Sequence, residues 1–122
     1  MQAQGAWTTE FYLEDRGTSA VEEFLDSLDP RTRARFGWSM EQLRVRNVQA
    51  REPLVRHLEG ELWELREESD RNIYRVIYFF FRGRRIVFLH GFQKKGQRTP
   101  RREIDTARER QRRFLAREAG RG

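Results

Sequence analysis

Residues 62–92, LWELREESDRNIYRVIYFFFRGRRIVFLHGF, decide the fold. Leu62 to Glu68 alternates between apolar and polar residues, which is typical of a half-buried strand. Ile73 to Phe81 is apolar on both faces with one interruption, as expected for a central strand. The tight turn Arg82-Gly83-Arg84 leads into a third strand, Ile86 to Phe92. Because short turns join these strands, the sequence predicts an antiparallel meander.

Three helices are predicted before and after this meander. Ser19 and Glu22 form a capping-box pattern at the start of the first helix. Asp29-Pro30 marks the start of the second, and Thr99-Pro100 the start of the last, which is expected to span residues 101–117. The apolar stripes expected to face inward are Val21, Phe24, Leu25 and Leu28; Phe36, Met40 and Leu43; and Ile104, Ala107, Phe114 and Leu115.

The N-terminal part of the chain supplies one more strand. Trp7 to Leu13 alternates and is predicted to be a strand, whereas residues 48–60 contain Pro53 and are interpreted as a connection. The sequence therefore predicts a single α+β domain over residues 1–122, with element order βααβββα. Two N-terminal helices are expected on one face of the antiparallel sheet, with the other face uncovered. Residues 1–6 and 118–122 are candidates for disorder.

Composition limits the function classes. The 122 residues contain no cysteine, which excludes disulfide scaffolds and thiolate metal sites and fits a cytoplasmic protein. No apolar run is long enough to span a membrane, and no secretion signal is expected. The net charge is +6, and nine Lys and Arg with no acid lie between Ile73 and Arg102. This local excess favours a phosphate-bearing partner over a merely solvated surface.

Two arginines lie on predicted strands. Arg66 has the parity of the polar face of its strand. Arg75 interrupts an apolar strand, so it must face a carboxylate, solvent or a ligand, and an ion pair with Glu64 or Glu68 is the structural alternative. His90 follows the parity of Phe88, which is compatible with a packed core histidine or with a catalytic one.

Lys94 and Lys95 are the only lysines of the chain and follow the last predicted strand. Two adjacent ammonium groups repel each other, which lowers the pKa of one or both. A lysine can therefore hold a phosphate or transfer a proton, whereas an arginine can only hold the phosphate. With no cysteine and no cluster of acids for magnesium, the sequence favours a site that needs no metal or other cofactor. Attack of an RNA 2′-hydroxyl on the neighbouring phosphate is the chemistry that suits such a site.

Several motifs together resemble one known family. The chain is similar to the phage-derived, HigB-like branch of the RelE/ParE toxin superfamily, and the resemblance covers about residues 7–117. Its elements occur in the same order as in that branch: Glu64-Leu65-Arg66, Tyr74-Arg75, Leu89-His90-Gly91-Phe92-Gln93-Lys94-Lys95, and Thr99-Pro100 before Glu103-Ile104 and Ala107.

This resemblance implies the toxin of a type II toxin–antitoxin pair, usually a ribosome-dependent endoribonuclease that cuts mRNA. Its implied partner is a helix-turn-helix antitoxin of the HigA or XRE type. Arg66 and Arg75 would then bind and polarise the scissile phosphate, and Lys94 and Lys95 would hold the RNA backbone, with one of them as a candidate for proton transfer. The arginines assigned to RNA binding are Arg82, Arg84, Arg98, Arg101 and Arg102. His90 is either structural or catalytic. Two alternatives are a toxin that binds a protein such as DNA gyrase, and a non-catalytic homologue that binds RNA or its antitoxin.

Overall fold

A five-stranded sheet forms the centre of the protein. The structure is a computed structural model that describes residues 6–93, 96 and 98–121. The strand order is β1-β5-β4-β3-β2, with β1 parallel to β5 and the other pairs antiparallel. The strands are β1 (Thr8–Phe11), β2 (Val55–Glu59), β3 (Leu62–Ser69), β4 (Asn72–Phe81) and β5 (Arg85–Gln93). The predicted α+β class and meander are confirmed.

Strand β2 is the element that the sequence did not predict. It lies within residues 48–60, which were interpreted as a connection, and pairs with β3 from Val55 opposite Leu65. Its apolar and polar residues alternate only weakly, and Pro53 lies just before it. Pairing with the edge of β3 therefore defines this strand more than its own pattern does.

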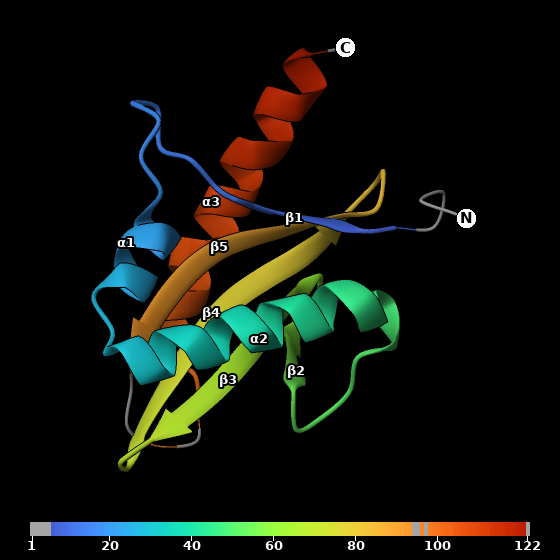
Figure 1. The fold of residues 1–122 in the computed structure, drawn as a ribbon. Helices are drawn as coiled ribbons and strands as arrows, with labels where there is room; N and C mark the ends of the chain where they lie inside the picture. Colours follow the sequence, from blue (N-terminus) through green and yellow to red (C-terminus); the bar gives the residue numbers. More distant parts are fainter. Residues whose placement is uncertain (1–5, 94–95, 97, 122) are drawn as a thin grey trace.

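Helices α1 (Ala20–Asp26) and α2 (Pro30–Arg46) cover one face of the sheet (Figure 1). The Ser19 hydroxyl accepts a hydrogen bond from the Glu22 backbone N–H (3.0 Å), and the Asp29 carboxylate accepts one from the Thr32 N–H (3.0 Å). Both predicted N-caps are therefore confirmed. A short 3₁₀ helix, η2 (Asn47–Gln49), follows α2. The core on this face includes Val21, Leu25, Phe36, Leu43, Leu65, Val76, Tyr78 and Phe88.

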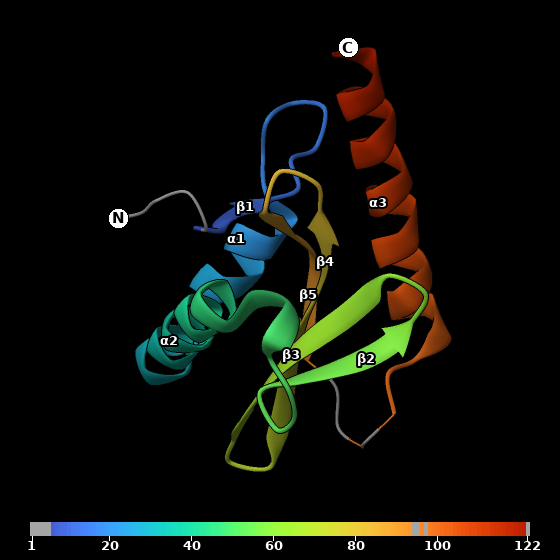
Figure 2. The ribbon, with the colours of Figure 1, turned by 90° about the vertical axis from the view of Figure 1, so that its right-hand side faces the viewer.

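Helix α3 (Arg101–Gly120) packs on the opposite face of the sheet (Figure 2). The expectation of an uncovered face is therefore wrong for the part of the sheet beneath α3, where Ile104, Ala107 and Phe114 join a second core. Gln111 is buried in place of the predicted Leu115, which is 38% exposed. The helix also extends beyond residue 117, while residues 1–5 and 122 lie outside the described part of the chain. Among the described residues, no helix is both long and apolar enough to cross a membrane.

A β-bulge in β5 changes which residues share a face. The pairing with β4 shifts between Ile77 and Tyr78, which face His90 and Phe88 respectively, so Leu89 is the extra residue. As a result His90 lies on the α3 side of the sheet, whereas Phe88 packs on the α1 side. The predicted shared parity of His90 and Phe88 is therefore wrong, since simple alternation does not survive a bulge.

The same bulge turns Gly91 toward α1, where only a glycine fits. A Cβ added at Gly91 would lie 2.4 Å from Phe24 Cδ2 and 2.9 Å from Phe24 Cγ. We expect Gly91→Ala to lower the free energy of unfolding by about 1–3 kcal/mol through overpacking, as measured by urea denaturation. Gly37→Ala, where the nearest atom is 4.0 Å away on a helix, should be neutral or stabilising. Equal stability of Gly91→Ala and wild type would contradict this account of the close packing.

Candidate functional site

Charged side chains from three strands gather on the α3 side of the sheet, toward its β2 edge. Arg66 on β3 lies directly opposite Arg75 on β4. Glu64, two residues before Arg66, lies opposite Arg56 on β2. Neighbouring positions of opposite parity, such as Leu65, point into the core beneath α2. The sheet register therefore brings three arginines around one carboxylate, and we call Arg56, Glu64, Arg66 and Arg75 the arginine cluster.

Glu64 is the acidic centre of the arginine cluster. Its side chain is fully buried, with Oε2 3.4 Å from Arg75 Nε and 3.9 Å from Arg66 Nε. The Thr99 hydroxyl donates a hydrogen bond of 2.8 Å to the other carboxylate oxygen. Burial raises the pKa of Glu64, while Thr99 and the arginines oppose that shift. Two of the three arginines and a hydroxyl thus contact one carboxylate directly.

Arg75 is buried as completely as Glu64. Its Nη2 donates a hydrogen bond of 2.8 Å to the Gly96 carbonyl, and its Nε faces Glu64. Burial lowers the pKa of Arg75, and Glu64 opposes the shift. The predicted ion pair with Glu64 is confirmed. The Arg75 side chain has no solvent-exposed surface, so of the three surroundings expected for it the structure shows a carboxylate and not solvent.

The segment after β5 lies against the arginine cluster. Gly96 accepts the hydrogen bond from Arg75, and Thr99 donates to Glu64. Thr99 was predicted to cap α3, but the helix begins after Pro100 without a side-chain cap, because the Thr99 hydroxyl is bonded to the buried carboxylate. The predicted Lys94 and Lys95 lie outside the described residues.

His90 joins β5 to α3. Its Nε2 lies 2.6 Å from Glu103 Oε1, and Arg110 donates to its Nδ1 at 3.2 Å. An acceptor at Nδ1 requires the proton on Nε2, which then donates to Glu103. The ring stacks on Phe92, and burial lowers the pKa of His90 despite the opposing effect of Glu103. This arrangement is that of the packed, hydrogen-bonded histidine, one of the two predicted alternatives.

The five arginines assigned to RNA binding do not gather in one place. Arg98 is exposed and lines a hollow of about 470 Å³ together with Arg56 and Thr99. Arg101 forms a two-bond ion pair with Glu59 on β2, and Arg102 is 78% exposed beside Glu103. By contrast, the remaining two lie in the β4–β5 turn, at the opposite end of β4 from Arg75. These two are Arg82 and Arg84.

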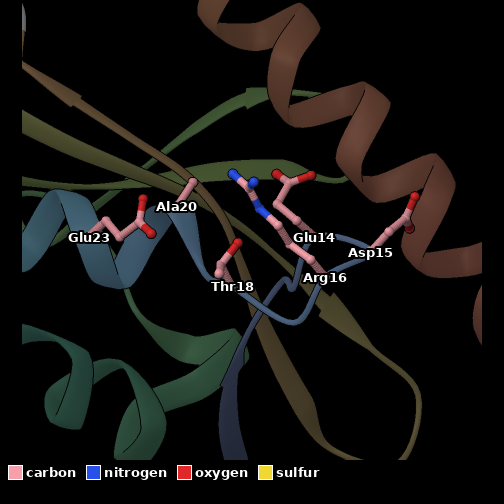
Figure 3. A pocket seen from close by; sticks show the side chains of 6 residues that line it. All are labelled: Glu14, Asp15, Arg16, Thr18, Ala20 and Glu23. Carbon is pink, nitrogen blue, oxygen red and sulfur yellow. The ribbon is translucent and has the colours of Figure 1, made fainter.

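Another hollow lies at the β1 edge of the sheet, away from the arginine cluster (Figure 3). Three carboxylates and one arginine line it, so its charge disfavours a phosphate ligand. The residues that line it are Glu14, Asp15, Arg16, Thr18, Ala20 and Glu23. Within the described part of the chain, no group of three or more His, Cys, Asp or Glu side chains is arranged to hold a metal ion.

Sequence reasoning missed Arg56 and the role of Thr99. Arg56 belongs to the strand that was interpreted as a connection. Its position opposite Glu64 could therefore not be predicted from the sequence. The only signal in the sequence was the weak pattern of Val55, Arg56 and His57, in which one apolar residue precedes two polar ones. Thr99 precedes a proline, a pattern typical of a helix start. The sequence therefore did not indicate that the Thr99 hydroxyl would instead bond Glu64 on β3.

Comparison with known proteins identifies the family. The model of the family described as "Phage derived protein Gp49-like (DUF891)" matches residues 23–112. The chain belongs to this family. It is therefore a member of the HigB-like branch of toxins that its motifs resemble.

Two curated relatives come from Mycobacterium tuberculosis, strains CDC 1551 / Oshkosh and ATCC 25618 / H37Rv, and both are named "Probable endoribonuclease HigB1". Each is 30% identical to this chain over 109 residues, which cover 89% of the chain and 84% of the relative. The Gp49-like match includes all strands from β2 to β5 and therefore the whole arginine cluster.

Proposed function

We propose that this Gp49-like protein is the toxin of a type II toxin–antitoxin pair and acts as an endoribonuclease on mRNA bound to the ribosome. The arginine cluster carries this proposal, because it sets Arg56 and Arg66 beside a hollow at the edge of the sheet. Three glutamates, Glu52, Glu67 and Glu68, also line this hollow, so the two arginines and not its net charge are the basis for phosphate binding. Cationic side chains at such a position bind phosphates and stabilise charge that develops on them. The name of the HigB1 relatives supports the same reaction class.

The reaction that fits this site is internal transesterification. The RNA 2′-oxygen attacks the adjacent phosphorus, the bond from phosphorus to the 5′-oxygen breaks, and the product strands end in a 2′,3′-cyclic phosphate and a 5′-hydroxyl. Arg66 and Arg56 are assigned to the phosphate, where they stabilise the additional negative charge of the transition state. Lys94 and Lys95 are proposed to hold the backbone, and one of them to move a proton.

Two buried residues are given positioning roles in this proposal. Arg75 is bonded to Glu64 and to the Gly96 carbonyl, so it fixes the segment that follows β5 relative to Arg66. His90 fixes the end of β5 on α3 through Glu103 and Arg110. Neither side chain is assigned to contact the RNA.

The proposed partners follow from the same family. A helix-turn-helix antitoxin of the HigA or XRE type, encoded beside the toxin, is expected to neutralise it in the cytoplasm. Expression of the chain alone should arrest growth, and co-expression of the adjacent gene should restore it.

A substrate lacking one hydroxyl tests the reaction directly. After cleavage sites have been mapped by primer extension on ribosome-bound mRNA, an mRNA with a single 2′-deoxynucleotide on the 5′ side of the cut should resist cleavage there. Cleavage at unmodified sites should leave 5′-hydroxyl ends, because the proposed reaction uses the 2′-oxygen as nucleophile. The ends are read by their resistance to ligation until they are phosphorylated.

Three results would overturn the proposal in different ways. Cleavage of the 2′-deoxy substrate at the same position would exclude 2′-oxygen attack. Product strands that end in a 5′-phosphate and a 3′-hydroxyl would indicate hydrolysis by water, as in metal-dependent nucleases. Growth arrest with intact mRNA and altered DNA supercoiling would instead support a gyrase-binding toxin.

A further inference from the structure

We propose that Trp38 is a stacking platform for a nucleobase of single-stranded RNA, at the far end of a groove that leads to Arg66. This inference rests on the proposed function and specifies where the strand that flanks the scissile phosphate binds. Trp38 lies on α2, and 63% of its surface is exposed. An indole this accessible gains little from the core, which makes it available to a ligand.

The groove has two walls. Trp38, Gln42 and Arg46 recur every four residues along α2 and therefore share one helix face. Residues 49–54, from η2 to the start of β2, form the opposite wall, and Arg66 and Glu67 on β3 lie between them. The volume of this open groove is about 460 Å³, which is within the usual range for a site that binds a small organic group.

This groove continues into the candidate site. Arg66 lines both the Trp38 groove and a neighbouring hollow of about 340 Å³ that also contains Arg56. Arg56 in turn lines the hollow that contains Arg98 and Thr99. Each hollow shares at least one lining residue with the next, and the proposed RNA track follows them from Trp38 around the edge of β3 to Arg98 and Thr99.

The charge of the track suits a polyanion. Five arginines line it against three glutamates, and one of those glutamates, Glu67, accepts a hydrogen bond from Ser39. Proteins that bind single strands combine a cationic groove with aromatic side chains on which bases stack. Gln42 and Gln49 add amide donors and acceptors that can bond a base edge. The arginines are Arg46, Arg51, Arg56, Arg66 and Arg98.

The composition of the groove favours RNA over a protein partner. Protein interfaces usually centre on several packed apolar side chains with few charges. Here Trp38 is accompanied mainly by amides, arginines and glutamates, with Pro53 and Leu54 as the other apolar residues. One aromatic platform among cations is the pattern of base stacking.

Binding of a non-cleavable oligonucleotide tests this inference. The probe is a fluorescein-labelled, fully 2′-O-methylated single strand of about ten nucleotides, measured by fluorescence anisotropy at low salt. We expect Trp38→Ala to weaken binding about 5- to 150-fold, which is the effect of removing one base-stacking aromatic. Trp38→Phe should retain most of the affinity. Val45→Ala, on the same helix and 59% exposed, is the matched control and should bind like wild type.

The outcomes separate the inference from the proposed function. Unchanged affinity in Trp38→Ala, with weaker binding in Arg66→Ala, would overturn the stacking platform and leave the nuclease proposal standing. Unchanged RNA affinity in Trp38→Ala together with lost neutralisation by the antitoxin would instead make this face a protein contact and overturn the inference. Absence of both binding and cleavage by the wild-type chain would overturn the two proposals together. Circular dichroism of each variant checks that an exposed substitution has left the fold intact.

Discussion

Replacing Arg75 with alanine should lower the free energy of unfolding by about 3–5 kcal/mol, because it leaves the buried Glu64 carboxylate without its closest cationic partner. Both side chains are fully buried, and the hydrogen bond from Arg75 to the Gly96 carbonyl is lost as well. Urea denaturation at neutral pH measures the change.

The pH dependence of this variant identifies the cause. Burial already raises the pKa of Glu64 above its ordinary value of 4.5, and loss of Arg75 should raise it further. A carboxyl group with a raised folded pKa binds more protons in the folded state, so stability falls as pH rises from the ordinary value through the folded pKa. The stability deficit of Arg75→Ala should therefore be larger near pH 8 than near pH 5.

Two further variants control this measurement. Arg112→Ala removes an arginine that is 71% exposed and should change the free energy of unfolding by no more than about 1 kcal/mol. Combining Arg75→Met with Glu64→Leu removes both buried charges and should recover most of the lost stability. A double variant as unstable as Arg75→Ala would show that the ion pair is not the source of the loss.

The sequence predicted those elements whose own pattern decides their structure. The meander from residue 62 to 92 and the caps at Ser19 and Asp29 follow from alternation and local hydrogen bonding, and the structure contains them. Strand β2 and the bulge at Leu89 depend on pairing with a neighbouring strand. A single strand's alternation does not carry that information, because register is a property of the pair.

The same distinction applies to the candidate site. Strand parity placed Arg66 and Glu64 on one face and offered Glu64 as a partner of Arg75, as the structure has it. Parity did not indicate that the chain after β5 would cover Arg75, since that depends on Gly96 and Thr99, which follow the strand. Burial of a charged side chain is decided by what packs over it, and here the covering segment is distant in sequence.

Replacing Arg66 with alanine should reduce the rate of mRNA cleavage by about 10²–10³-fold, the usual effect of removing one group that stabilises charge in the transition state. Arg66 keeps 19% of its side-chain surface exposed, and its Nε lies 3.9 Å from the Glu64 carboxylate, so part of the side chain is accessible to a phosphate. Arg66→Lys keeps the charge but loses the planar, two-bond geometry of the guanidinium group. Its cleavage rate should therefore lie between the rates of wild type and Arg66→Ala. Single-turnover cleavage of ribosome-bound mRNA measures each rate.

Comparison of Arg66→Ala with Arg75→Ala then separates a direct effect on RNA cleavage from an effect on the stability of the fold. Arg66→Ala should remain close to wild type in urea denaturation, because the buried Glu64 carboxylate keeps its closer contacts with Arg75 and Thr99. Arg75→Ala should lose stability and activity together. The double variant with Arg75→Met and Glu64→Leu should regain stability but not full activity, because the hydrogen bond to the Gly96 carbonyl is still missing. Arg112→Ala should cleave like wild type. An Arg66→Ala protein that is folded and fully active would remove Arg66 from the site, whereas restoration of full activity in the double variant would remove the positioning role of Arg75.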